Sequence, residues 1–91
     1  MTIQSITESE FSKYVTKVAL GVTKEVAWYK SDKSDLIGTV FQDTIDKDWG
    51  YVILAKEDDG SYKPQDVGSS IDSQSIADKE LFDKMLQIEE Y

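Results

Sequence analysis

The 91-residue sequence contains no cysteine, no histidine, no arginine and no asparagine. Without cysteine, neither a disulfide framework nor a thiolate metal site can form. Without histidine and cysteine, the chain lacks the commonest general base and the strongest thiol nucleophile. Without arginine, it lacks the fork-shaped donor that binds carboxylates and phosphates at two points. Other reactive side chains remain, so catalysis is disfavoured rather than excluded, and we expect a non-enzymatic protein with no cofactor.

The chain also lacks a long apolar run. Its first residues, MTIQSITESEF, contain neither the basic region nor the apolar region of a signal peptide. We therefore expect neither secretion nor a membrane span. The absence of cysteine fits a reducing compartment, so we predict a cytoplasmic location.

Positive charge is scarce in one half of the chain. The net charge is −8, and all ten basic residues are lysines. Residues 1–42 hold five acids and five lysines, whereas residues 43–91 hold thirteen acids and five lysines. Such a surface repels nucleic-acid phosphates and anionic lipid headgroups. We therefore expect no direct nucleic-acid or membrane binding, and a protein partner with a basic surface fits the charge better.

The first periodic segment predicts a helix over roughly residues 8–20. Thr7 and Glu10 match a capping box, and Gly21 stands where a helix commonly ends. Apolar residues recur at helical spacing between them: Phe11, Tyr14, Val15, Val18 and Ala19.

The middle of the chain predicts three strands and a weaker fourth. The strands cover residues 25–30, 36–42 and 49–56, where aromatic and β-branched residues concentrate between short turns. Asp59-Gly60 is typical of a two-residue hairpin turn. Residues 61–70 form the weak strand, which Pro64 confines to an edge because proline cannot donate to a ladder.

The last segment predicts an amphipathic helix that Ser73 or Ser75 caps. Its apolar residues fall on one broad face: Ile76, Ala77, Leu81, Phe82, Met85, Leu86 and Ile88.

These elements predict a single α+β domain over residues 1–91. The expected architecture is a two-layer sandwich in the order α-β-β-β-(β)-α, with a three- or four-stranded antiparallel meander and both helices on one face of the sheet. The strands at 36–42 and 49–56 carry apolar residues on both sides. Either residues 61–72 or a helix end therefore covers the second face, or that face is an interface for a homodimer or a partner.

The two acidic turns carry carboxylates, which are the ligands that hard cations such as Ca²⁺ prefer. Asp43, Asp46 and Asp48 share one turn, and Asp58 and Asp59 share another. The run DTIDKDWG does not match the calcium loop of an EF-hand, which needs a different spacing and a later glutamate. Aspartate is common in turns because it bonds to its own backbone, so we interpret both turns as solvated and predict no metal.

The candidate contact residues are therefore aromatic and acidic. The two tryptophans could stack on a ring-shaped ligand, although tryptophan in a small domain is usually core. Gly38 and Gly50 do not form a phosphate loop and instead predict bulges or close packing beneath an aromatic ring. The full candidate set is Trp28, Asp46, Asp48, Trp49, Tyr51, Asp58 and Asp59.

The segment Asp35–Tyr62 resembles a type of small uncharacterised bacterial α+β domain with a D-x-D-W-x-Y-V strand-turn-strand core. The residues that carry the resemblance are Asp43, Asp46, Asp48, Trp49, Tyr51, Val52, Leu54 and Gly60. In that type of domain an E/D-G hairpin and a C-terminal helix follow this core, so the resemblance extends over about the last two-thirds of the chain; it omits the first helix and implies a fold but no activity.

Three functions follow in order of preference. The first is protein–protein contact or homo-oligomerisation, with apolar residues at the centre and carboxylates at the rim. The second is mimicry of a nucleic acid, in which carboxylates occupy a DNA- or RNA-binding protein; the acids gather at turns rather than in a periodic row, which weakens it. The third is a carboxylate-based enzyme, which requires a cleft and two carboxylates of divergent pKa.

Overall fold

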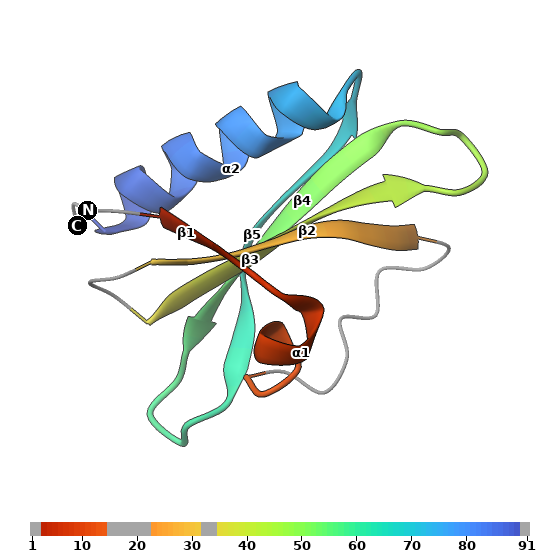
Figure 1. The fold of residues 1–91 in the computed structure, drawn as a ribbon. Helices are drawn as coiled ribbons and strands as arrows, with labels where there is room; N and C mark the ends of the chain where they lie inside the picture. The colour runs from red at the N-terminus through yellow and green to blue at the C-terminus, as the bar shows by residue number, and fades with distance from the viewer. Residues whose placement is uncertain (1–2, 15–22, 32–34, 90–91) are drawn as a thin grey trace.

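The computed structural model describes residues 3–14, 23–31 and 35–89. Five antiparallel strands form one sheet in chain order (Figure 1). The strands are β1 (Ile3–Ile6), β2 (Thr23–Ser31), β3 (Leu36–Asp43), β4 (Trp49–Lys56) and β5 (Tyr62–Ile71). The helices are α1 (Glu8–Phe11), between β1 and β2, and α2 (Gln74–Glu89), after β5. The predicted α+β fold with an antiparallel meander is confirmed.

The sheet has one strand more than the sequence predicted. β1 precedes α1 and pairs with the end of β2, from Ile3 opposite Ser31 to Ile6 opposite Trp28. Its four residues are too few to show a clear alternation, and the two central ones are polar. The strand exists because β2 offers it a partner more than twenty residues away in sequence, which no local pattern reveals.

Helix α1 is much shorter than predicted. The Thr7 hydroxyl accepts a hydrogen bond from the Glu10 amide at 3.2 Å, which confirms Thr7 as the N-cap. The helix nevertheless ends at Phe11, and residues 12–14 form turns. The prediction of helix over residues 12–14 was therefore wrong, and its part from residue 15 to Gly21 lies outside the described residues. Four helical residues are too few to be stable without tertiary contacts, so Phe11 must fix α1 by packing.

Helix α2 covers one face of the sheet. Ala77, Leu81 and Met85 are fully buried against β3 and β4, and Ser73 caps the helix by accepting from the Ile76 amide at 3.3 Å. The predicted apolar face was too wide, since Ile76 and Leu86 are exposed. The residues that form this α2-side core are Leu36, Val40, Tyr51, Ile53, Ile71, Ala77, Leu81 and Met85.

Helix α1 lies on the opposite face of the sheet from α2, so the helices do not share a layer as predicted (Figure 1). Phe11 packs there with Ile37, Val52 and Leu54, and we call these four residues the second-face core. They alternate along β3 and β4 with residues of the α2-side core, as side chains of a strand must. Residues 62–71 do not fold over this face, because they are a strand of the sheet itself.

Candidate functional site

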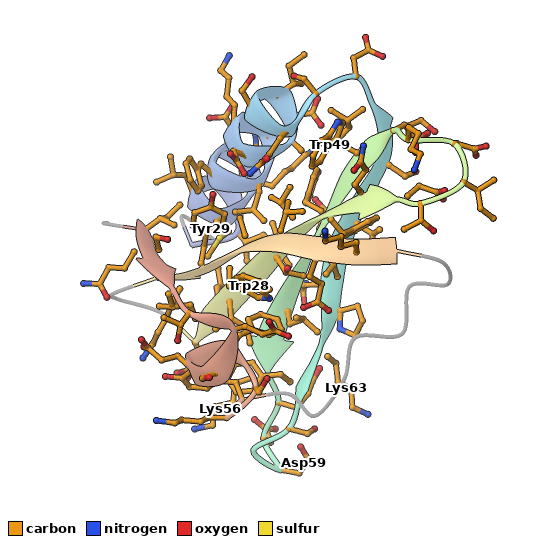
Figure 2. All side chains as sticks on the ribbon, turned by 45° about the vertical axis from the view of Figure 1, so that its right-hand side comes forward. Trp28, Tyr29, Trp49, Lys56, Asp59 and Lys63 are labelled. Carbon is orange, nitrogen blue, oxygen red and sulfur yellow. The ribbon has the colours of Figure 1, made fainter. Side chains whose placement is uncertain are left out.

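The seven candidate contact residues do not form one site. Asp46, Asp48 and Trp49 lie at the β3–β4 turn, whereas Asp58 and Asp59 lie at the β4–β5 turn. The eight residues of β4 separate the two turns by about 24 Å at the usual rise of a strand. Figure 2 shows Trp49 and Asp59 at opposite ends of the sheet. We therefore treat the two turns as separate surfaces.

The β3–β4 turn is organised by the side chain of Asp43. One carboxylate oxygen of Asp43 accepts the backbone amides of Ile45 at 2.8 Å and Asp46 at 2.9 Å. Both bonds hold the pKa of Asp43 below its usual range, with the Asp46 amide the larger cause. Lys47 closes the turn in the left-handed region with φ 65°, and its amide donates to the Asp43 carbonyl at 2.9 Å. This backbone holds the carboxylates of the turn in a defined arrangement.

A β-bulge brings β5 against the β3–β4 turn. Trp49 pairs with Ile71 and Tyr51 pairs with Gly68, so Ser69 and Ser70 together lie opposite the single residue between Trp49 and Tyr51. Ser70 has φ 57°, the second non-glycine residue with positive φ among those described. The bulge bends the end of β5 and places its serines beside the acidic turn.

Turn and bulge enclose a hollow of about 330 Å³. Its lining combines aromatic and aliphatic side chains with carboxylates and hydroxyls. The lining residues are Phe41, Asp43, Asp46, Asp48, Trp49, Val67, Ser69 and Ser70. Asp46, Asp48 and Trp49 are candidates that the sequence predicted, and the structure brings them together here.

The hollow is flanked by the two most exposed large apolar side chains among the described residues. Ile45, at the tip of the turn, is 71% exposed, and Val67, in the wall of the hollow, is 51% exposed. An exposed apolar residue alone needs no explanation, but here two of them adjoin three carboxylates and a half-buried tryptophan. This combination of apolar surface with an acidic rim is the composition of a protein contact surface.

The two tryptophans differ in their surroundings. Trp49 is half-buried, with one side against the α2-side core and another in the wall of the hollow. Trp28 packs against the second-face core, and its indole nitrogen donates to the Glu25 carboxylate at 2.8 Å. Trp28 is therefore bonded within β2 and does not line the hollow, so of the two tryptophans Trp49 alone is among its described lining residues.

Tyr51 is a core residue. It is only 3% exposed, and its ring lies directly over Gly68 of the neighbouring strand. Burial raises the pKa of the Tyr51 phenol, and the carboxylates of Asp66 and Glu80 raise it further. Because its ring cannot reach a partner in the folded protein, Tyr51 leaves the candidate surface.

The β4–β5 turn also carries acids, and one of them, Asp59, bonds to the turn itself. The Asp59 carboxylate accepts the amide of Ser61 at 2.9 Å and its hydroxyl at 2.6 Å, and these bonds lower the pKa of Asp59. Gly60 has φ 89°, with open space where a Cβ would stand. The loop holds three residues rather than the predicted two, because the Glu57 amide bonds to the Ser61 carbonyl at 2.7 Å and Gly60 forms a bulge.

Sequence reasoning missed half of the hollow. Phe41 and Val67 were assigned to strands without a role, and Ile45 was passed over, although an apolar residue inside the acidic run TIDKD is a usable signal. The serines carry no such signal, because only the bulge turns them toward the hollow. Among the residues that the structure describes, no three acidic side chains are placed to hold a metal ion.

The chain matches no family model, no curated protein and no solved structure in the three comparisons that were made. Within the described ranges, neither helix has the length and apolar character that a membrane crossing requires.

Proposed function

We propose that this protein is a non-enzymatic binding module that contacts a basic protein partner through the hollow at the β3–β4 turn. The observation that carries the proposal is the pairing of Ile45 and Val67, the most exposed large apolar side chains described, with the carboxylates of the hollow. We place the protein in the cytoplasm, because the cysteine-free composition suits a reducing compartment.

The apolar side chains supply the affinity of such a contact. Each removes apolar area from water when a partner covers it, at roughly 25 cal/mol per Å² before the costs of association. Trp49 adds a rigid aromatic surface whose buried side is already fixed by the core, so little rotamer freedom is lost on binding. The contact would therefore centre on Ile45, Trp49 and Val67.

The carboxylates select the partner and speed its approach. Asp43, Asp46 and Asp48 outnumber the single lysine of the turn, Lys47. A lysine- or arginine-rich surface meets opposite charge here, which raises the association rate at low salt and penalises acidic competitors. A two-fold homodimer would place the same aspartates against their own copies, so we favour a basic partner over a second copy of this chain.

Affinity capture with matched charge variants tests the proposal. The bait proteins are the wild type, Ile45→Ser, and the double variant Asp46→Asn/Asp48→Asn. The control is Glu57→Gln/Asp58→Asn, which removes the same charge from exposed residues at the other end of the sheet. Each bait is incubated with a lysate of the source cells at low and moderate salt. A captured protein is then purified and titrated against all four baits.

Support consists of one basic protein that the wild type and the control bind with similar affinity and the other two variants bind at least about tenfold more weakly. Its binding should also weaken as salt rises, since exposed charge pairs are screened. If the control variant loses as much affinity as the other two, or if Ile45→Ser and Asp46→Asn/Asp48→Asn lose none, the hollow is not the contact surface.

A further inference from the structure

The segment Thr7–Tyr14, which we call the strap, covers the second face of the sheet. It contains α1 and the turns that follow, and most of its side chains are exposed. Phe11 is the exception: it is 3% exposed and packs with Ile37, Val52 and Leu54. Phe11 is therefore the buried anchor of the strap, and Ile6, Tyr14, Trp28 and Tyr62 pack around the same cluster.

The described backbone hydrogen bonds of the strap run within the strap itself. The amides of Phe11, Ser12 and Tyr14 donate to the carbonyls of Thr7, Glu8 and Phe11 at 2.9–3.0 Å, and the Lys13 amide donates to Glu10 at 3.1 Å. None of the described backbone hydrogen bonds of residues 8–14 reaches a strand. Every strand, by contrast, is joined to its neighbour by a ladder.

Apart from the chain itself, which continues from β1 into Thr7, the described contacts of the strap with the sheet are made by side chains. Besides Phe11, the Tyr14 ring meets Tyr62 edge to face at 5.5 Å between centroids. The Lys30 ammonium donates to the Tyr14 hydroxyl at 2.9 Å and lies 5.1 Å from the centre of its ring. Phe11 thus contacts residues of β3 and β4, and Tyr14 contacts residues of β2 and β5, through side chains.

We infer that the strap opens from the second face as a unit while the five-stranded sheet and α2 stay folded. The physical reason is that opening breaks side-chain contacts only, whereas unfolding the sheet also breaks its ladders. Each opening takes the Phe11 ring away from Ile37, Val52 and Leu54 and so exposes apolar surface that is covered in the closed state. This surface and the hollow both involve β3 and β4 but share no residue, and the inference does not depend on the proposed function.

Native-state hydrogen exchange of the whole protein tests the inference. The reporters are the amides of Phe11, Ser12, Lys13 and Tyr14, and the references are the amides of β3 and β4. We expect the reporters to exchange about tenfold faster than the references or more, with rates that do not respond to low concentrations of urea. Equal rates and an equal response to urea would show that the strap opens only when the whole protein unfolds, and would overturn the inference.

Two phenylalanine variants separate local from global opening. Phe82→Ala removes a ring on the α2 side, where Phe82 meets Tyr29 edge to face at 4.9 Å. That ring stays packed whether the strap is open or closed, so Phe82→Ala should speed exchange in β3 and β4 and leave the reporters unchanged. Phe11→Ala should speed the reporters about tenfold or more. A reporter that accelerates in Phe82→Ala as much as the references do contradicts the inference.

The milder variant Tyr14→Phe covers the case in which Phe11→Ala does not fold. It removes the hydroxyl that accepts from Lys30 and keeps the ring against Tyr62. The reporters should exchange severalfold faster than in the wild type. The exchange rates of the reference amides should rise by that factor at most. Reporters that remain as slow as in the wild type would show that this contact does not hold the strap closed.

Discussion

The two acidic turns at opposite ends of β4 look alike in sequence and differ in structure. The β4–β5 turn uses Gly60 at φ 89° and leaves open space around it. The β3–β4 turn reaches the left-handed region with Lys47 at φ 65°, and the bulge of Ser69 and Ser70 closes on it from β5. The hollow lies at the β3–β4 turn because the neighbouring strand β5 bends against that turn.

Charge balance separates the turns further. Glu57, Asp58 and Asp59 lie close in sequence to Lys56 and Lys63, and Figure 2 shows Lys56, Asp59 and Lys63 at the same end of the sheet. Lys63 is near enough to lower the pKa of Asp59, after the two bonds from Ser61. The β3–β4 turn has three aspartates and only Lys47. The comparison teaches that acidic composition alone does not mark a contact surface, since packing and local charge balance decide it.

The largest effect is expected from Gly50→Ala, beside the hollow. A Cβ on Gly50 would stand 2.6 Å from the Gly68 carbonyl oxygen and 2.6 Å from the Phe41 ring. Because a backbone atom is in the way, the strands must shift, and we expect a loss of about 1–3 kcal/mol in the free energy of unfolding. Urea denaturation followed by tryptophan fluorescence measures it. If Gly50→Ala lowers the free energy of unfolding by less than Gly60→Ala does, the strands beside the hollow are loosely packed.

Gly60→Ala tests the other turn and should cost less, about 1 kcal/mol. A Cβ here meets no atom within 4 Å, so the cost comes only from the positive φ. The same urea titration applies. Because the added methyl group would touch no other residue, chemical-shift changes should stay within residues 57–61. Changes that reach the hollow would contradict the independence of the two ends.

A pH-dependent effect follows from Asp43→Ala. The pKa of Asp43 is lowered by the backbone bonds from Asp46 and Ile45, so its ionised form stabilises the folded state above the unfolded pKa of about 3.9. That contribution is lost as the pH falls through the folded pKa. The urea midpoint of the variant should be lower than that of the wild type at pH 7, and the difference should shrink at about pH 3. Asp59→Ala should follow the same trend, because Ser61 lowers the pKa of Asp59. A difference for Asp43→Ala that is independent of pH would contradict the role of its carboxylate.

The smallest effect on stability is expected from Ile45→Ser. Ile45 is 71% exposed, so its removal should change the free energy of unfolding by less than about 0.5 kcal/mol. Thermal and urea denaturation check this. The variant is then a clean probe of binding, because any loss of affinity comes from the surface and not from the fold. A large destabilisation would instead show that Ile45 packs within the protein.

Local patterns predicted the central elements well. β3 and β4 begin at the predicted residues, and the Gly50 backbone lies beneath an aromatic ring, Phe41, as expected. The strands were recognisable because aromatic and β-branched residues concentrate between short turn-forming segments. β1 and the length of α1 were not predictable, because the first depends on a distant partner and the second on where Phe11 finds its core.

Three of the seven candidate residues lie at the hollow, and four do not. The acidic turns and the strand between them can be seen in the sequence, but the bulge of β5 that lies beside one of the turns appears only when β4 and β5 are paired. Tyr51 illustrates the same limit. The alternation of side chains along β4 assigns Tyr51 to one face of the sheet. Whether that face is covered depends on where α2 packs.

The sequence alone determined the chemistry of this protein: no thiol, no imidazole and no guanidinium, an acidic second half, and a run of strands that ends in an amphipathic helix. These properties belong to individual residues and to short periods along the chain. The tertiary structure decided which helix covers which face, and it placed the β5 bulge beside one turn and not the other. Such choices depend on contacts between residues far apart in the chain, whose energies no local pattern encodes.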